Sequence, residues 1–330
     1  MSDIAQRAGV SKVTVSAVLS ATAGNNTRVA ETTRQRILDA ARELNYSPNG
    51  IAKMFRHRST DIVGLYLGDW LLSTHNLFLA EIVSGLQIGC HEHRKDLLIH
   101  STFRGQDVND IYMELISRKI DGLIMFALES DPLAIRLASS ALPVVAIADA
   151  VPSLPSVVAD DKLGSNLIAD YLAAKGHKHV LYRRGWSLQA SANRRYLSFM
   201  EAAARHTMKV SESTLPTSQF GLIMDEQEIA ILNRPKTTRP TAIVCTNDYL
   251  AYAAVDYCQD HGFKVPEDFA ILGFDGMVTE IRPATRLTTI RAPWAEVART
   301  ALGLVVKSLA GESVPFETVL PVELVIGDTA

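Results

Sequence analysis

The chain has 330 residues and a mass of 36.1 kDa, which is too long for one compact core, because single cores stop growing near about 250–300 residues. Hydrophobic residues make up 47% and charged residues 21% of the sequence, which excludes a disordered, collagen-like or coiled-coil protein. No uninterrupted apolar run approaches the roughly 20 residues that cross a bilayer. We therefore expect two or three globular domains and no membrane-spanning segment.

The cysteines and the N-terminal residues indicate the cellular compartment. Three cysteines, Cys90, Cys245 and Cys258, cannot form a paired disulfide framework. Asp3 and Arg7 stand where a secretory signal would carry its apolar stretch. Both features predict a cytoplasmic protein with reduced thiols.

The charge is divided unevenly along the chain. Residues 1–60 hold nine Lys and Arg against four Asp and Glu, a net charge of +5, whereas residues 61–330 hold 24 Lys and Arg against 32 Asp and Glu, a net charge of −8. A small basic unit of this kind suits binding to the phosphates of DNA, because such binding releases counterions. The alternative is an ordinary solvated charged face.

The order of residues in this basic unit favours DNA binding. Residues 3–8 have a helical apolar face, Gly9 allows a tight turn, and Ser11 or Thr14 can cap a second helix. The second helix has an inner face of Val10, Val15, Val18 and Leu19 and an outer face of Lys12, Val13, Ser16 and Ala17. A third helix over residues 31–44 buries Ile37, Leu38, Ala41 and Leu44. Three short helices with an exposed second helix are typical of a helix-turn-helix headpiece.

Residues 61–330 alternate between short apolar runs and amphipathic stretches. The expected strands are residues 62–68, 122–127, 143–148, 179–183, 241–246 and 269–274, and the expected helices are residues 77–94, 107–118, 161–175, 192–206, 248–261 and 294–309. Apolar strands separated by helices predict parallel sheets covered on both faces, with ligands at the carboxyl ends of the strands. The length allows two such sheets.

Several segments resemble the lactose-repressor (LacI/GalR) family of bacterial transcription regulators. DIAQRAGVSKVTVSAVLS is similar to the helix-turn-helix signature of that family, and TRQRILDAARELNYSPN is similar to its third helix. The runs KIDGLIM, PVVAIAD, ADDKLGS, TAIVCTNDYLAYAA and VPEDFAILGFD also resemble family landmarks. The resemblance implies an α/β fold, in which a helical headpiece and a hinge helix precede a two-lobed, periplasmic-binding-protein-like core of two doubly wound parallel sheets.

The resemblance also divides the chain. It implies a headpiece over residues 1–47, a hinge helix over 48–60 and an effector-binding and dimerisation core over 61–330. Lobe 1 is expected to comprise about 61–158 and 291–318, and lobe 2 about 159–288 and 321–330. Residues 21–28 resemble an insertion between the second and third helices.

Residues that contact DNA follow from the family motif. The implied set is Ser11, Lys12, Val13, Thr14, Ser16, Ala17, Arg28, Tyr46, Asn49, Ala52 and Phe55. Lys12, Val13 and Ala17 occupy the base-reading positions, where Val and Ala offer apolar contact such as with a thymine methyl group. Phe55 stands where the family carries a leucine that is inserted into the minor groove, and an apolar Phe can also unstack a base step.

The resemblance also implies effector-binding residues, of which Asp149, Asn247 and Asp275 lie at the carboxyl ends of predicted strands. The set is Phe78, Asp149, Asp160, Arg195, Phe220, Asn247, Asp275 and Trp294. Arg, Asp and Asn groups suit a ligand rich in hydroxyl groups, and aromatic faces can stack on sugars. Each aromatic residue could equally belong to the core, and Asn247, Asp248 or Asp161 could cap a helix.

The sequence lacks the motifs of the enzyme classes considered. It contains no phosphate-binding Gly-x-x-x-x-Gly-Lys loop, no Gly-x-Ser-x-Gly and no His-Glu-x-x-His. His91 and His93 are two residues apart and do not share a helical face, so they are not expected to bind one metal ion. We expect neither catalysis, nor a metal, nor a cofactor.

Together these features and the family resemblance predict a homodimeric repressor that binds a palindromic double-stranded operator and responds to a small carbohydrate effector. The alternatives are a nucleobase or a protein co-regulator as the effector, or a solute-binding protein for transport. The basic headpiece and the absent export signal argue against the transport protein.

Overall fold

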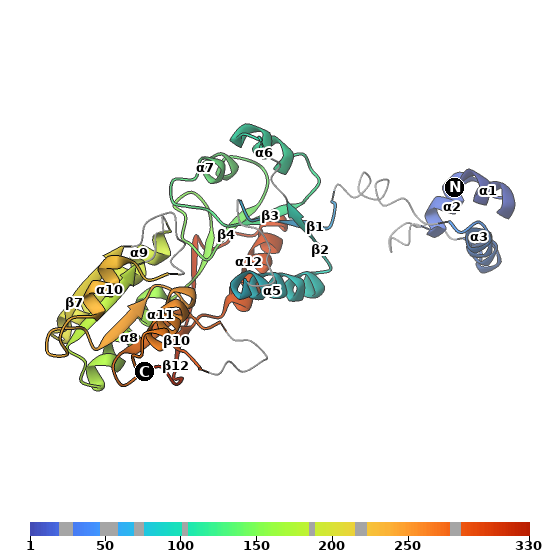
Figure 1. Ribbon diagram of the computed structural model, residues 1–330. Coiled ribbons are helices and arrows are strands. Elements are labelled where there is room, and N and C mark those ends of the chain that lie inside the picture. The colour runs from blue at the N-terminus through green and yellow to red at the C-terminus, as the bar shows by residue number, and fades with distance from the viewer. Residues whose placement is uncertain are drawn as a thin grey trace. The chain divides into compact units, whose positions relative to one another are not determined.

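The computed structural model describes residues 1–19, 29–46, 59–68, 76–100, 105–184, 189–214, 223–277 and 285–330. The chain forms two compact units, Met1–Thr60 and Asp61–Ala330. Each unit has its own hydrophobic core, and each is described here by itself (Figure 1). No helix in the described ranges is long and apolar enough to cross a membrane.

The first unit contains the helices α1 (Ser2–Ala8), α2 (Lys12–Leu19) and α3 (Glu31–Glu43). Gly9 ends α1 with a φ of 65°, a conformation that glycine adopts readily. The small core is made of Ile4, Ala5, Ala8, Val15, Val18, Ile37, Ala40 and Ala41. The expected burial of Leu44 is wrong, because this residue follows α3 as its C-cap and is 45% exposed.

Lobe 1 of the second unit is built on a six-stranded sheet with the order β11-β5-β4-β3-β1-β2. All its strand pairs are parallel. Its strands are β1 (Ile62–Tyr66), β2 (Asp96–His100), β3 (Gly122–Met125), β4 (Val144–Ile147), β5 (Ser156–Ala159) and β11 (Glu317–Leu320). One face is covered by α5 (Leu77–His93) and α12 (Trp294–Leu309), and the other by α6 (Val108–Leu115) and α7 (Pro132–Ala138).

Lobe 2 is built on a second six-stranded sheet with the order β12-β10-β9-β8-β6-β7, in which only β12 is antiparallel to its neighbour. Its strands are β6 (His179–Arg184), β7 (Lys209–Thr214), β8 (Ala242–Cys245), β9 (Ala270–Asp275), β10 (Thr288–Arg291) and β12 (Glu323–Val325). Its faces are covered by α8 (Asp161–Ala174) and α9 (Ala190–Arg205) on one side and by α10 (Glu226–Leu232) and α11 (Asp248–Asp260) on the other.

The chain passes between the two sheets three times. It leaves lobe 1 between Ala159 and Asp161, returns between Arg291 and Trp294, and leaves again between Leu320 and Glu323. The carboxyl ends of β4, β8 and β9 therefore lie near these crossings, where parallel α/β sheets place their ligands.

The predicted fold class is confirmed: the core is α/β, with two mostly parallel sheets that carry helices on both faces. The six predicted strands and six predicted helices are all present, with ends shifted by a few residues. The predicted pattern did not include β2, β5, β7, β10, β11, α7 and α10. Most of these are short, and β2, β7 and β11 are edge strands with polar residues.

Candidate functional site

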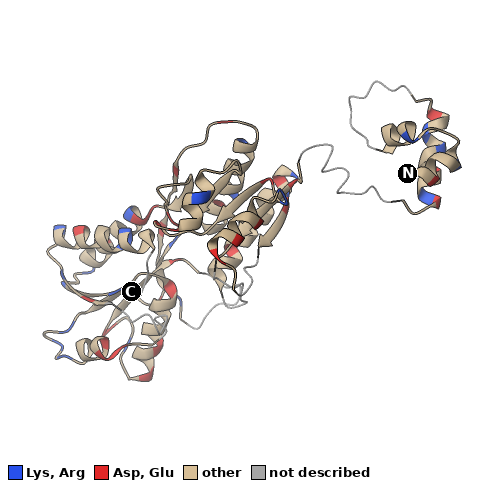
Figure 2. Cartoon of the chain, turned by 90° about the horizontal axis from the view of Figure 1, so that it is seen from above, with Lys and Arg blue, Asp and Glu red and all other residues tan. Residues whose placement is uncertain are grey.

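The outer face of α2 in the headpiece presents the residues that were expected to read DNA. Val13 is 76% exposed and Lys12 is exposed, whereas Ser16 and Ala17 are half-buried. Val15 and Val18 face the core of the headpiece. An exposed helix face backed by a small core has the geometry that enters a major groove. Figure 2 shows Lys and Arg residues on the helices of this unit.

The hydroxyl groups at the start of α2 serve the helix itself. The backbone amide of Thr14 donates to Ser11 Oγ at 3.1 Å, and the two side-chain hydroxyls are 2.8 Å apart. Ser11 therefore caps α2, which was one of the two roles considered for it. Tyr46 is half-buried against the headpiece core. The other expected DNA contacts, Arg28, Asn49, Ala52 and Phe55, and the segment 21–28 lie outside the described residues.

Arg195 is the centre of a buried polar network in lobe 2. Its Nε donates to Asp161 Oδ1 at 2.8 Å, and its Nη1 donates to the carbonyl oxygen of Thr246 at 2.9 Å and to Asp275 Oδ1 at 3.3 Å. The guanidinium also lies 3.7 Å from the centre of the Phe274 ring. The hydrogen bonds therefore fix the arginine through Nε and Nη1, and Nη2 has no hydrogen bond to the described residues.

Two carboxyl groups of this network hold protons more tightly than usual. Burial raises the pKa of Asp275 to about 7, although Arg195 opposes the shift. Burial also raises the pKa of Asp248 to about 6, against hydrogen bonds from Thr289 and from the amide of Met277. Asp275 further has a φ of 125°, which non-glycine residues rarely adopt outside functional sites. A ligand that donates hydrogen bonds to Asp275 would favour its ionised form.

Asp149 connects the two lobes. It follows β4 of lobe 1, and its carboxylate accepts hydrogen bonds from the amides of Ala190 at 2.8 Å and Ser191 at 2.7 Å at the start of α9 in lobe 2. Burial raises the pKa of Asp149, while these two amides and Arg194 oppose the shift. The carboxylate thus serves as a cap for a helix that belongs to the other lobe.

Two other predicted residues cap helices within lobe 2. Asp160 Oδ1 accepts from the amide of Leu163 at 2.8 Å, and Asn247 Oδ1 accepts from the amide of Leu250 at 2.9 Å. The caps considered at Asp161 and Asp248 are wrong, because each cap lies one residue earlier. Both of these aspartates are instead buried and bonded to side chains of other elements.

The predicted aromatic residues lie at the starts of two lobe-1 helices. The Phe78 ring is 4.9 Å from the Trp294 ring in an edge-on arrangement and 5.7 Å from the Phe126 ring. Phe78 is half-buried, whereas Trp294 is 2% exposed and its Nε1 has no hydrogen-bond partner among the described residues. Trp294 therefore belongs to the core, with one polar atom available to a partner. Phe220 lies outside the described residues.

Three further residues join this site that were not expected from the sequence pattern. Arg194 donates two hydrogen bonds to Asp161, Thr289 donates to Asp248, and Tyr249 donates from its hydroxyl to Asn76 Oδ1 of lobe 1 at 3.4 Å. Arg194 and Tyr249 could have been found from the sequence, because Arg194 directly precedes Arg195 and Tyr249 directly follows Asp248. Thr289 lies on β10, which the apolar pattern did not reveal, although RLTTI at residues 286–290 resembles a landmark of the family.

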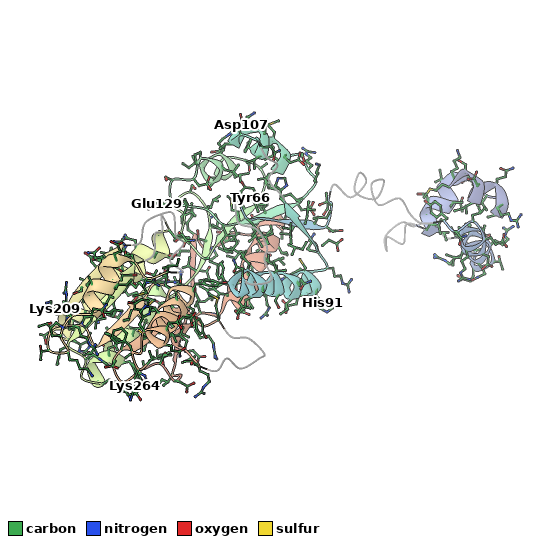
Figure 3. The ribbon with its side chains drawn as sticks, in the orientation of Figure 1. Tyr66, His91, Asp107, Glu129, Lys209 and Lys264 are labelled. Atoms are coloured by element: carbon green, nitrogen blue, oxygen red, sulfur yellow. The ribbon has the colours of Figure 1, made fainter. Side chains whose placement is uncertain are left out.

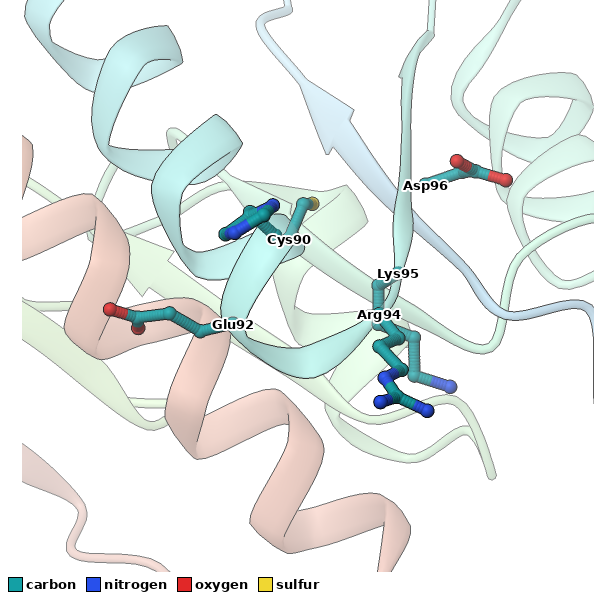
Figure 4. A pocket seen from close by; sticks show the side chains of 6 residues that line it. Cys90, Glu92, Arg94, Lys95 and Asp96 are labelled. Atoms are coloured by element: carbon teal, nitrogen blue, oxygen red, sulfur yellow. The ribbon is translucent and has the colours of Figure 1, made fainter.

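A cavity of about 810 Å³ lies away from the carboxyl ends of the strands, at the end of α5 (Figure 4). Its lining comprises Cys90, His91, Glu92, Arg94, Lys95 and Asp96. Glu92 pairs with Arg299, and Lys95 pairs with Asp61 and Asp121. Throughout the described ranges, no group of three or more His, Cys, Asp or Glu residues could hold a metal ion.

A helix-turn-helix unit together with a two-lobed core whose polar network lies at the strand ends defines a ligand-responsive DNA-binding regulator. Family models agree with this division of the chain. The model of bacterial regulatory proteins of the lacI family matches residues 1–49, and that of the periplasmic binding protein-like domain matches residues 169–330.

Characterised relatives cover almost the whole chain. The HTH-type transcriptional repressor PurR of Mannheimia succiniciproducens is 30% identical, over 98% of this chain and 96% of its own. The HTH-type transcriptional regulator DegA of Bacillus subtilis is also 30% identical, over the same shares of the two chains. The protein belongs to the LacI family of DNA-binding transcription regulators, and it is not an enzyme.

Solved structures share the fold. The lac repressor dimer bound to operator and the anti-inducer ONPF superimposes with a TM-score of 0.82 at 24% identity, over 99% of this chain and 97% of that one. The complex of the transcriptional regulator CelR with cellobiose gives a TM-score of 0.69 at 23% identity, over 99% of this chain and 98% of that one.

Proposed function

We propose that the protein is a cytoplasmic, homodimeric repressor whose affinity for a palindromic operator is controlled by a small carbohydrate bound between the two lobes. Residues 1–47 would form the DNA-binding headpiece, 48–60 the hinge, and 61–330 the sensor. Dimerisation is argued from the headpiece, because one recognition helix reads only half of a palindromic site.

The observation that carries this proposal is the arrangement around Arg195. Asp161 and Thr246 hold the arginine in place, and Asp275 lies beside it at the end of β9. A guanidinium nitrogen next to a carboxyl group matches adjacent hydroxyls of a sugar, which both donate and accept hydrogen bonds. The half-buried Phe78 ring supplies an apolar face for stacking. The cellobiose complex of a structurally similar regulator supports the same effector class.

A nucleobase is the alternative effector, because a planar heterocycle can also stack on Phe78 and bond to Arg195 and Asp275. A protein co-regulator would need no ligand in the cleft. Both alternatives keep the same DNA-binding role.

For operator recognition, the exposed Lys12 and Val13 and the half-buried Ala17 are proposed to meet base edges. Val13 and Ala17 offer only methyl groups, which favour contact with thymine. The proposed phosphate contacts are Ser11, Thr14, Ser16, Arg28 and Tyr46. The proposed contacts with the minor groove are Asn49, Ala52 and Phe55.

The two lobes provide the route from effector to operator. Asp149 caps α9 across the lobes, and Tyr249 donates to Asn76 across them. An effector that binds one arrangement of the lobes better than another would shift operator affinity by a coupling free energy of about 1–3 kcal/mol.

The test is a thermal unfolding screen of the full chain against monosaccharides, disaccharides, sugar acids and nucleobases. A ligand at about 100 times its Kd stabilises the native state by about 2.7 kcal/mol. Arg195→Ala is expected to abolish the shift given by a wild-type hit. Arg205→Ala is the matched control on the same helix, because Arg205 bonds to Asn166 and is exposed. An undiminished shift in Arg195→Ala would remove this arginine from the effector site.

A further inference from the structure

A second cavity, of about 520 Å³, lies between the lobes beside the start of α9. Lobe 1 contributes Glu129, Ala150 and Pro152, and lobe 2 contributes Arg184, Asn193 and Arg194 among other residues. Figure 3 labels Glu129 on the lobe-1 side. The α9 residues that line this cavity lie on the helix face next to the one that carries Ser191 and Arg195. The cavity is therefore adjacent to the Arg195 network, which it touches through Arg194.

Arg184 brings a positive charge to this cavity. Its Nη2 donates to the amide oxygen of Asn193 at 3.1 Å, and its guanidinium lies 4.5 Å from the centre of the Tyr196 ring. No ion pair of Arg184 occurs in the described ranges. The side chain is thus held in position by a neutral amide and an aromatic ring. An arginine fixed in this way keeps its remaining donors for an anion.

Arg194 lies beside it and is fixed from behind. Its Nε and Nη2 both donate to Asp161 Oδ2, at 3.0 and 2.8 Å, and its side chain remains 33% exposed. Nη1 has no hydrogen bond to the described residues, so it is available on the exposed side. Across the cavity, Glu129 is the one acidic residue in the described lining. The lining thus carries two arginines and one glutamate, and Arg194 is also paired with Asp161 and, at 3.8 Å, with Asp149, so Arg184 supplies the charge without an ion pair to the described residues.

We propose that this cavity binds a phosphate or carboxylate group, held chiefly by Arg184 with Arg194 as the second contact. The guanidinium groups match the paired oxygens of such an anion. Because the walls come from both lobes, the bound anion would favour one arrangement of the lobes. The inference rests on the proposed function in one respect: the anion is either the charged end of the effector or a free anion beside it.

The first experiment titrates inorganic phosphate into the full chain at constant ionic strength, with chloride as the replaced anion, and measures the midpoint of thermal unfolding. Phosphate is expected to raise the midpoint of the wild type. Arg184→Met should weaken the apparent phosphate affinity by about tenfold or more. Glu129→Gln should strengthen it, because the opposing charge is removed. Arg205→Met, the control for loss of a surface charge on lobe 2, should leave it unchanged.

The second experiment compares sugar phosphates with their neutral parent sugars. If the anion is part of the effector, a sugar phosphate binds more tightly than its parent, and Arg184→Met abolishes the difference. If the anion is free, phosphate still binds through Arg184, and the sugar phosphate has no advantage over its parent.

The proposal is overturned if Arg184→Met binds phosphate and sugar phosphates as the wild type does, or if Arg184→Met and Arg205→Met lose affinity equally. These results are independent of the cleft assignment. Arg195→Ala tests that assignment with the neutral ligands. The effector site at Arg195 can therefore be contradicted while the anion site is supported, and the anion site can be contradicted while the effector site is supported.

Discussion

Arg183 is among the largest fully buried side chains of the described residues, and it lies on β6 in lobe 2. Its Nε pairs with the equally buried Glu228 at 2.8 Å, and its other nitrogens donate to the carbonyl oxygens of Leu250 and Ile223. Ser213 also donates to Glu228. This network ties α10 and α11 to the sheet. Because all three guanidinium nitrogens of Arg183 donate hydrogen bonds and Glu228 accepts from Arg183 and Ser213, the two buried charges are compensated.

We expect Arg183→Met to destabilise the protein by about 3–5 kcal/mol, because it leaves Glu228 as an uncompensated buried charge. The double variant Arg183→Met/Glu228→Gln should recover part of the loss, since the amide removes that charge and can still accept from the Asp225 amide. Urea unfolding followed by circular dichroism measures both. A double variant that is no more stable than the single one would contradict this account.

The raised pKa of Asp275 predicts a pH dependence of stability. Between its ordinary value of 3.8 and about 7 the unfolded chain has already lost this proton while the folded chain retains it. Stability is therefore expected to fall as the pH rises through this window and to level off above it. In Asp275→Asn the fall should be shallower, and in the surface control Asp256→Asn it should be unchanged. Thermal midpoints measured from pH 4 to pH 8 check this, and equal slopes in all three proteins would contradict it.

At the scale of elements, α5 and α12 pack with their backbones in close contact. A Cβ atom added at Gly85 of α5 would lie 2.0 Å from the carbonyl oxygen of Ala295 in α12. Gly303 of α12 differs, because the nearest atom to an added Cβ is His93 Nε2 at 4.0 Å. Only the first glycine is therefore required by the packing of the helices.

Gly85→Ala is expected to destabilise lobe 1 by about 1–3 kcal/mol or more, because backbone atoms would have to move. Gly303→Ala is expected to stabilise it by about 0.4–1 kcal/mol through the better helix propensity of alanine. The midpoint of chemical unfolding of each variant, compared with that of the wild type, measures both effects. If both variants moved in the same direction, the close approach of the helices would be wrong.

The elements also define what the sequence can predict. The central strands are apolar, so their composition is sufficient to predict them from the sequence; they are β1, β3, β4, β6, β8 and β9. The edge strand β7, with the sequence Lys-Val-Ser-Glu-Ser-Thr, has one apolar residue and gives no such signal. The site divides in the same way: strand-end residues such as Asp275 follow from the pattern. The cap that Asp149 gives to α9 does not, because it joins residues 41 positions apart in different lobes.

At the scale of the whole molecule, the opposite charges of the two units predict how DNA binding depends on salt. The headpiece region carries +5 and the remainder −8, so binding to a DNA duplex of mixed sequence should depend on the headpiece alone. The logarithm of affinity should fall linearly with the logarithm of salt concentration, with a slope of about −0.9 for each phosphate contact.

Lys12→Gln is expected to reduce the size of this slope by about one for each headpiece bound, if the lysine contacts a phosphate as well as a base. Lys175→Gln in lobe 2 is the control and should leave the slope unchanged. Fluorescence anisotropy between about 50 and 200 mM salt measures it. A larger effect of Lys175→Gln than of Lys12→Gln on the slope would indicate that the core contacts the DNA, and it would contradict the assignment of DNA binding to the headpiece.

The last strands of the chain have a consequence for synthesis and for genetics. β11 completes one sheet and β12 the other, and beyond them the buried Thr329 bonds to the backbone of Ile271 and Thr288. During translation the headpiece precedes the core, whereas both sensor lobes await the segment from Glu317 to Thr329. A nonsense mutation shortly before the codon of Glu317 would therefore remove a strand from each lobe at once while the DNA-binding unit is still encoded. Such alleles are expected to impair effector response and core stability together.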